Sequence, residues 1–99
     1  MPHSTLNFAW NPGKAAANLR KHGISFAEAA TAFTDEFALI VPDEEHSQDE
    51  PREILIAYST RNRLLFVSFV QRAPDLIRIV SARRADAQEQ RSYEENARF

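Results

Sequence analysis

Helical spacing of apolar residues and strong capping signals dominate the first third of the chain. Asn11 can accept a hydrogen bond as an N-cap, Pro12 suits the first helical position, and Gly23 suits the left-handed residue after a helix. Together these residues predict a helix over 12–22. Two further helices are predicted over 26–33 and 87–97, each opened by a pair with capping-box spacing, Ser25 with Glu28 and Asp86 with Glu89.

On a helical wheel the first predicted helix has two sides. One arc holds Lys14, Asn18, Lys21 and His22, and the neighbouring apolar arc holds Ala15, Ala16 and Leu19. The apolar arc is therefore expected to pack, and the other arc to present cations. The helix dipole disfavours a cation in the first turn, where Lys14 is predicted to lie. Lys14 is therefore either a solvated surface lysine or part of a site.

Strands rich in apolar, branched and aromatic residues are predicted elsewhere, over 7–10, 37–41, 53–60, 63–71 and 76–82. Arg61-Asn62 indicates a tight hairpin, because asparagine tolerates a positive φ. The acidic stretch 43–51 is expected to be a solvated loop. The order β-α-α-β-β-β-β-α describes an α+β domain. We expect a small, mostly antiparallel sheet with the two N-terminal helices packed on one face and a C-terminal helix.

Length and composition indicate one globular domain. The 99 residues, 43% apolar and 26% charged, fit a single domain over 1–99 with a short leader at 1–6. No apolar run approaches the ~18 residues of a membrane span and no signal peptide is evident, so a cytoplasmic protein without a membrane partner is expected. The chain has no cysteine for disulfides or thiol chemistry, and its three histidines lack metal-ligand spacing, so neither a metal nor a cofactor is expected.

Charge is divided along the chain, although the net charge is only −2. Residues 1–23 hold three bases and no acid, 24–51 hold eight acids and no base, and 52–91 hold eight arginines against four acids. A protein divided in this way can bind a polyanion while remaining acidic overall. Arginine greatly outnumbers lysine, and its planar fork suits phosphate and carboxylate.

Several arginines cluster around two predicted strands and their ends, namely Arg61, Arg63, Arg72, Arg78, Arg83 and Arg84. RNA cleavage without a metal needs a base for the 2′-hydroxyl, cations for the charged transition state and an acid for the 5′ oxygen. Arginine suits the middle role. In a regular strand Arg83 shares the face of Ile79 and Arg78 the opposite face, so the two are not expected to enter one site. Arg61 and Arg63 are equally well explained as polar residues of the hairpin turn with no role in a site.

Three residues are candidates for proton transfer, and each has a structural alternative. His22 would lie in the last helical turn, where the dipole favours imidazolium, so it is either a proton donor or phosphate ligand, or a C-terminal cap. Glu89 and Tyr93 lie four residues apart on the last helix and share a face. Glu89 suits a general base, and Tyr93 suits a group that stacks on a nucleobase or transfers a proton. Glu89 also fits the capping box, and Tyr93 the docking of the helix. The loop around His46 is expected to be a solvated connection.

These residues resemble the motifs of the BrnT family of bacterial toxins from type II toxin–antitoxin systems. The N-terminal match comprises Trp10-Asn11-Pro12-Gly13-Lys14, Asn18, Lys21-His22-Gly23-Ile24-Ser25-Phe26 and Ala29, and the C-terminal match comprises Ile79-Val80-Ser81-Ala82-Arg83-Arg84-Ala85 with Glu89, Arg91, Tyr93 and Glu94. The resemblance implies a RelE-like fold, a ribonuclease that halts growth by cutting RNA, and a BrnA-type antitoxin that supplies the DNA-binding part of a repressing complex. The 43–51 loop is longer and more acidic than the family pattern suggests, and it would repel RNA if it lay beside the site.

The first functional hypothesis is a metal-independent endoribonuclease toxin that inhibits translation and growth. From the residues and the resemblance together, the catalytic candidates are Arg83, His22, Glu89, Arg63 and Tyr93, and the RNA-binding candidates are Lys14, Lys21, Arg78 and Arg91. The expected partners are RNA and a BrnA-type antitoxin, with DNA contacted only through the antitoxin. A homodimer and a heterotetramer with the antitoxin are both open. The second hypothesis is a non-catalytic binding module whose basic face holds an acidic protein or a nucleic acid.

Overall fold

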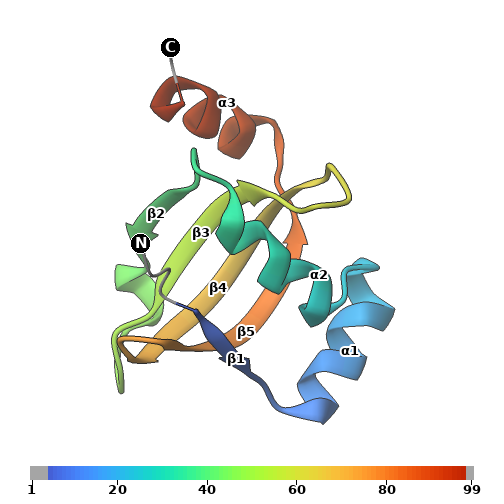
Figure 1. The fold of residues 1–99 in the computed structure, drawn as a ribbon, viewed down its shortest axis with the longest axis vertical. Helices are drawn as coiled ribbons and strands as arrows, with labels where there is room; N and C mark the ends of the chain where they lie inside the picture. Colours follow the sequence, from blue (N-terminus) through green and yellow to red (C-terminus); the bar gives the residue numbers. More distant parts are fainter. Residues whose placement is uncertain (1–4, 98–99) are drawn as a thin grey trace.

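The computed structural model describes residues 5–97, which form an α+β domain around one five-stranded sheet (Figure 1). The sheet order is β1-β5-β4-β3-β2; β1 runs parallel to β5, and the remaining pairs are antiparallel. The bounds are β1 Asn7–Ala9, α1 Pro12–His22, α2 Phe26–Thr31, β2 Leu39–Pro42, β3 Glu53–Tyr58, β4 Leu64–Ala73, β5 Leu76–Arg84 and α3 Ala87–Asn96, with short 3-10 helices η1 at Ala32–Thr34 and η2 at Glu44–His46. This order confirms the predicted fold class. Residues 1–4 of the expected leader lie outside the described part.

The ends of α1 lie where the sequence predicts them. The Asn11 side chain accepts a hydrogen bond from the backbone N–H of Lys14 at 3.1 Å. Gly23 has a φ of 72°, and its N–H donates to the carbonyl of Leu19 at 2.8 Å. Because few residues other than glycine adopt this backbone conformation at low cost, Gly23 lets the chain leave the helix at once.

Capping of α2 differs from the prediction. The Ser25 hydroxyl accepts from the backbone N–H of Glu28 at 3.0 Å, but the Glu28 carboxylate binds Ser59 on the β3–β4 hairpin, so only half of the predicted capping box forms. The α-helix ends at Thr31 and the chain continues as the 3-10 turn η1. In α3, by contrast, the predicted box of Asp86 and Glu89 is complete.

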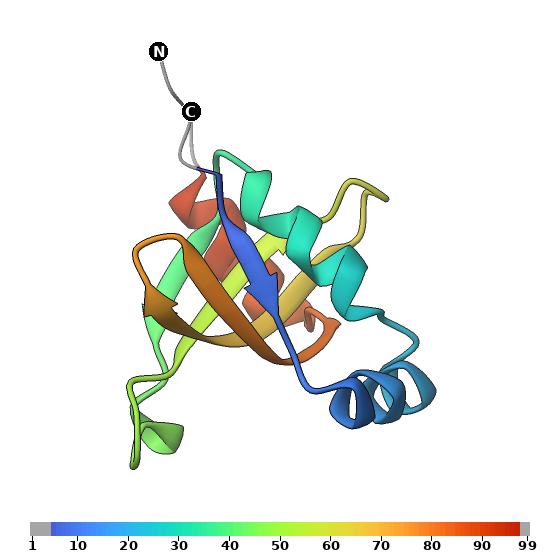
Figure 2. The same ribbon diagram turned by 60° about the horizontal axis from the view of Figure 1, so that its bottom comes forward.

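The sheet has a separate hydrophobic cluster on each face. Both α1 and α2 pack on one face, with α1 beside the edge of β5, whereas α3 lies against the opposite face (Figures 1 and 2). The first cluster includes the fully buried Ile24, Phe26, Leu55, Leu65, Val67 and Ile79. The second is smaller and centres on Ile56, Tyr93 and Ala97, with Ile54, Leu64 and Phe66 packed against it. The second face is thus only partly covered.

Turn and edge chemistry explain the limits of two strands. Asn62 has a φ of 64°, as the predicted hairpin requires, and its N–H donates to the carbonyl of Ser59 at 2.9 Å. The strand expected at 37–41 instead spans Leu39–Pro42. Pro42 is tolerated there because β2 is an edge strand, so the missing N–H costs no bond on the open side.

A β-bulge in β5 overturns the expected placement of its arginines. The register pairs Ser68 with Ser81 but Phe69 with Ile79, which leaves Val80 as an extra residue. The bulge reverses the alternation of faces, so Ala82 joins Ile79 in the first cluster and Arg83 points to the second face. Arg83 pairs with Phe66 and Arg78 with Val70, two residues of one β4 face. The prediction that Arg78 and Arg83 lie on opposite faces was therefore wrong.

Asn18 fastens α1 to the free edge of β5, contrary to the wheel-based expectation that it belongs to an exposed cationic arc. It is buried, and its amide nitrogen donates to the carbonyls of Ile24 at 2.9 Å and Ala82 at 2.8 Å, while its amide oxygen accepts from the N–H of Ala82 at 3.1 Å. Leu19, expected to pack, is 49% exposed. Since β1 pairs with β5 only through Arg78, the side chain of Asn18 replaces a strand along the next stretch of β5.

Candidate active site

A cavity of about 390 Å³ lies on the second face of the sheet. Its lining residues come from β3, β4, β5 and the segment between β2 and β3, and they are Asp43, Glu45, His46, Arg52, Ile54, Phe66, Ser68, Ser81 and Arg83. Polar groups thus surround an apolar wall of Ile54 and Phe66. This volume falls within the range of small-ligand sites, and it is large enough for part of a nucleotide chain.

Arg83 is held at this cavity by three contacts. Its guanidinium carbon lies 4.0 Å from the centroid of the Phe66 ring, a cation–π arrangement. Its two terminal nitrogens bind both oxygens of Glu89, at 2.9 and 2.8 Å, and one of them also donates to the carbonyl of Arg84 at 3.0 Å. These hydrogen bonds from Arg83 to Glu89 raise the pKa of the guanidinium further, against the smaller opposing effect of burial. Arg83 is therefore a fixed, permanent positive charge with part of its surface open.

Glu89 connects that charge to the start of α3. One carboxylate oxygen accepts both from Arg83 and from the backbone N–H of Asp86 at 2.9 Å, and the N–H of Glu89 donates to the Asp86 side chain at 2.8 Å. The capping role, which the sequence offered as the alternative to a base, thus coexists with the pairing to Arg83. Both oxygens of Glu89 are occupied, which makes the side chain an anchor for Arg83.

The acidic segment between β2 and β3 is folded beside Arg83. Glu50 pairs with Arg72 at 2.7 Å and with Arg78 at 3.3 Å, and these bonds tie the segment to β4 and β5. Six of the nine residues at 43–51 are exposed, as expected for a solvated connection, but these long-range ion pairs of Glu50 also hold the segment on the sheet. Part of its negative charge is balanced by these two arginines.

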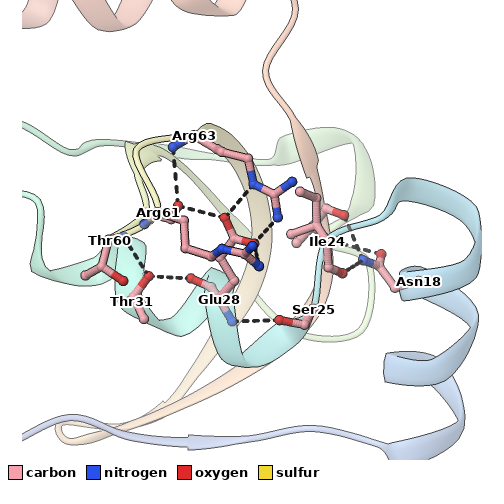
Figure 3. Close-up of polar contacts among 10 residues, drawn as sticks. Asn18, Ile24, Ser25, Glu28, Thr31, Thr60, Arg61 and Arg63 are labelled. Atoms are coloured by element: carbon pink, nitrogen blue, oxygen red, sulfur yellow. Dashed lines mark hydrogen bonds and ion pairs between the residues drawn. The ribbon is translucent and has the colours of Figure 1, made fainter.

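Arg63, a catalytic candidate from the sequence, is engaged elsewhere (Figure 3). Its Nε donates to the Glu28 carboxylate at 2.9 Å, and a terminal nitrogen binds the other oxygen of Glu28. The Ser59 hydroxyl donates to the same carboxylate at 2.7 Å, and a terminal nitrogen of Arg61 lies 3.9 Å from a Glu28 oxygen. The hydrogen bond from Arg63, opposed by burial and aided by Ser59, lowers the pKa of Glu28, so the carboxylate stays ionised. This pair clamps the hairpin to α2 and is not part of the cavity lining.

Tyr93 serves to dock α3, the alternative that the sequence left open. Its ring packs edge-on against Tyr58 with centroids 5.4 Å apart, and its hydroxyl donates to Asp35 at 2.7 Å. Burial, together with Asp35, raises the pKa of Tyr93 well above its usual value. Burial acts to raise the pKa of Asp35, but hydrogen bonds from the backbone of Tyr58 and Phe37 and from Tyr93 lower it overall. Tyr93 is therefore a neutral donor away from the cavity lining.

The remaining candidates do not line the cavity with Arg83. Lys14, Lys21 and His22 are exposed on α1, Arg91 is exposed on α3, and none of the four lines the cavity. Arg78 shares the sheet face of Arg83 but pairs with Glu50. The structure thus joins Arg83 with Glu89 and leaves the α1 residues outside this site.

Sequence reasoning missed every polar lining residue other than Arg83, namely Asp43, Glu45, His46, Arg52, Ser68 and Ser81. Nδ1 of His46 lies 3.0 Å from an oxygen of Asp43, and the three-residue spacing of this pair was the available signal, hidden in a run of acids. Arg52 Nε is buried without a hydrogen-bond partner among the described residues. Over residues 5–97, no group of three or more histidine and acidic side chains is arranged to hold a metal ion. No helix in that range is long and apolar enough to cross a membrane.

Comparisons with known proteins converge on one family. Residues 10–89 match the family model described as the ribonuclease toxin BrnT of type II toxin–antitoxin systems. The crystal structure of the Brucella abortus ribonuclease toxin BrnT superposes with a TM-score of 0.64 at 23% sequence identity, covering 83% of this chain and 99% of that one. At this identity the likeness shows a shared fold. A comparison with curated protein sequences found no significant match.

Proposed function

The chain belongs to the BrnT family of ribonuclease toxins of type II toxin–antitoxin systems, and from this premise we propose that it is a metal-independent endoribonuclease whose active site is the cavity beside Arg83. The observation that carries the proposal is the placement of Arg83. Its charge is fixed between the Phe66 ring and Glu89 on the rim of a polar cavity. A preorganised cation of this kind stabilises a transition state because it does not have to reorient during the reaction.

The proposed reaction uses the 2′-hydroxyl of the substrate as the nucleophile. Its oxygen attacks the adjacent phosphorus, and the charge that develops on the non-bridging oxygens is stabilised by Arg83. The 2′-hydroxyl gives up its proton to a base, the bond from phosphorus to the 5′ oxygen breaks, and the 5′ oxygen takes up a proton. The products are a 2′,3′-cyclic phosphate and a 5′-hydroxyl. Glu89 is a positioning residue in this scheme, because its two bonds aim the guanidinium.

Cations outside the cavity are proposed to bind flanking phosphates of the RNA. Lys14 and Lys21 on α1 and Arg91 on α3 are exposed and suited to this role, and Arg78 lies on the same sheet face as Arg83. Contacts of this type weaken as salt concentration rises, because binding releases counterions from the nucleic acid.

The experiment combines RNA cleavage in EDTA with substitution of Arg83. Wild-type protein is expected to produce 2′,3′-cyclic phosphate ends in chelator, and Arg83→Ala to abolish cleavage while its thermal unfolding changes little, since a partly exposed pair contributes at most about 1 kcal/mol. Arg84→Ala is the matched control, because Arg84 is the exposed neighbour and does not line the cavity. Lasting loss of cleavage in EDTA would reject the metal-free route. Wild-type activity in Arg83→Ala would reject the assignment of Arg83. Binding of RNA without cleavage by the wild type would favour the binding module instead.

We further propose a BrnA-type antitoxin as the protein partner and the cytoplasm, where the RNA is, as the location. α3 buries only Tyr93 near its centre and Ala97 just after its end, and most of its remaining surface is open to a partner. Co-expression with the product of the neighbouring open reading frame should give one stable complex. Elution of the two proteins as separate species would contradict this pairing.

A further inference from the structure

A histidine faces the same cavity as Arg83 and is already paired with a carboxylate. Nδ1 of His46 lies 3.0 Å and 3.2 Å from the two oxygens of Asp43. The Asp43 side chain is only 13% exposed, whereas His46 is 58% exposed. A carboxylate on one ring nitrogen favours one tautomer and orientation of an imidazole, so that the other nitrogen exchanges protons. In His46 that other nitrogen is Nε2, which lies 3.9 Å from Oε1 of Glu45.

Backbone and hydroxyl bonds hold this pair in place. The N–H of Asp43 donates to the carbonyl of Arg52 at 2.8 Å, which closes the base of the segment. The Ser47 hydroxyl donates to the carbonyl of Asp43 at 2.6 Å and accepts from the N–H of Arg52 at 2.9 Å. With Glu50 bound to two arginines of the sheet, the segment that carries His46 is fastened at both ends.

The other lining residues supply the complementary chemistry. Arg83 lines the cavity from β5, and Ser68 and Ser81, which also line it, are paired across β4 and β5. Proton transfer and stabilisation of phosphate charge need separate groups within reach of one phosphodiester, and His46 and Arg83 line one cavity.

We propose that His46 is the general base of the ribonuclease reaction and that Asp43 is its positioning residue. This inference rests on the proposed function and adds the proton-transfer group to it. Nε2 of neutral His46 accepts the proton of the 2′-hydroxyl as the 2′ oxygen bonds to phosphorus. The bond between phosphorus and the 5′ oxygen breaks, the 5′ oxygen takes a proton from solvent water, and the imidazolium returns its proton to solvent.

The test measures single-turnover cleavage of a short RNA in EDTA across pH. His46→Ala is expected to slow cleavage by about 100-fold or more, with RNA affinity unchanged within threefold, because general base catalysis contributes on the order of 10²–10⁴. His46→Ala should also lack the fall in cleavage rate that the wild type is expected to show at acidic pH. Asp43→Asn should slow cleavage less and shift that fall. The charged groups around His46 to consider in the profile are Asp43, Glu45, Asp49, Glu50, Arg52 and Arg83.

Controls separate this proposal from the proposed function. Glu44→Gln is the matched control, an exposed neighbour in the same 3-10 turn that does not line the cavity, and it should cleave like the wild type. If His46→Ala does not fold, His46→Gln takes its place. Cleavage by His46→Ala within threefold of the wild type overturns the assignment of His46 alone, as does a slowed variant that keeps the acidic fall in rate. A wild type and a control that both fail to cleave contradict the ribonuclease proposal itself.

Discussion

Replacement of Asn18 by alanine tests how α1 is held to the sheet. The side chain makes three hydrogen bonds of 2.8 to 3.1 Å, to the carbonyls of Ile24 and Ala82 and to the N–H of Ala82, and the residue is only 8% exposed. At about 1 kcal/mol net for each bond, Asn18→Ala should lower the free energy of unfolding by roughly 3 kcal/mol. Alanine has the higher helix propensity, so the loss reflects tertiary contacts rather than a weaker helix.

Thermal unfolding followed by circular dichroism measures this change. For a domain of this size each kcal/mol shifts the melting temperature by about 4–8 °C, so the expected fall is about 12–24 °C. Arg20→Ala, an exposed change on the same helix, should stay within about 0.5 kcal/mol of the wild type. Amide hydrogen exchange at Ala82 should also accelerate, because that N–H loses its acceptor. A melting temperature for Asn18→Ala within about 4 °C of the wild type would refute this reasoning.

Substitutions at three further positions test other parts of the fold. The bond with Arg63 lowers the pKa of Glu28, so this pair stabilises the fold fully above pH 4.5, the usual pKa of glutamate, and less as the pH falls through the lowered pKa. Glu28→Gln should therefore lower the melting temperature at pH 7 and much less in acid. An equal effect at both pH values would contradict the pairing. Tyr93→Phe removes the bond to Asp35 and should cost about 1 kcal/mol in urea unfolding, with no change expected if that bond is absent. Asn62 has a φ of 64°, a backbone conformation that glycine adopts more easily than alanine. Asn62→Gly should therefore keep or slightly raise the melting temperature, and Asn62→Ala should lower it. The reverse order would disprove a left-handed residue in the turn.

Much of the candidate site could not be predicted from the sequence. Arg83 was identified and lies in the cavity, but its face was inferred from regular alternation, which the bulge at Val80 reverses. His46 was assigned to a solvated loop because the stretch 43–51 around it holds five acids and no arginine or lysine. Arg83 of β5 lines the same cavity as His46, and arginines of β4 and β5 bind Glu50 in the same segment; nothing in the local pattern indicates either.

The order of the elements, the cap of α1, the hairpin turn at Asn62 and the α+β class were all predictable from the amino-acid sequence. These features depend on residues within a few positions of each other, whose backbone preferences and spacing are visible in the chain. The partners of the polar side chains, by contrast, depend on contacts between distant parts of the folded chain. Asn18 binds Ala82 across 64 positions, Glu28 leaves its capping box for Arg63, and Glu50 carries the acidic segment to the sheet. The physical reason is that a buried or charged polar group binds the best partner that folding brings within reach, and the register of distant strands sets that choice.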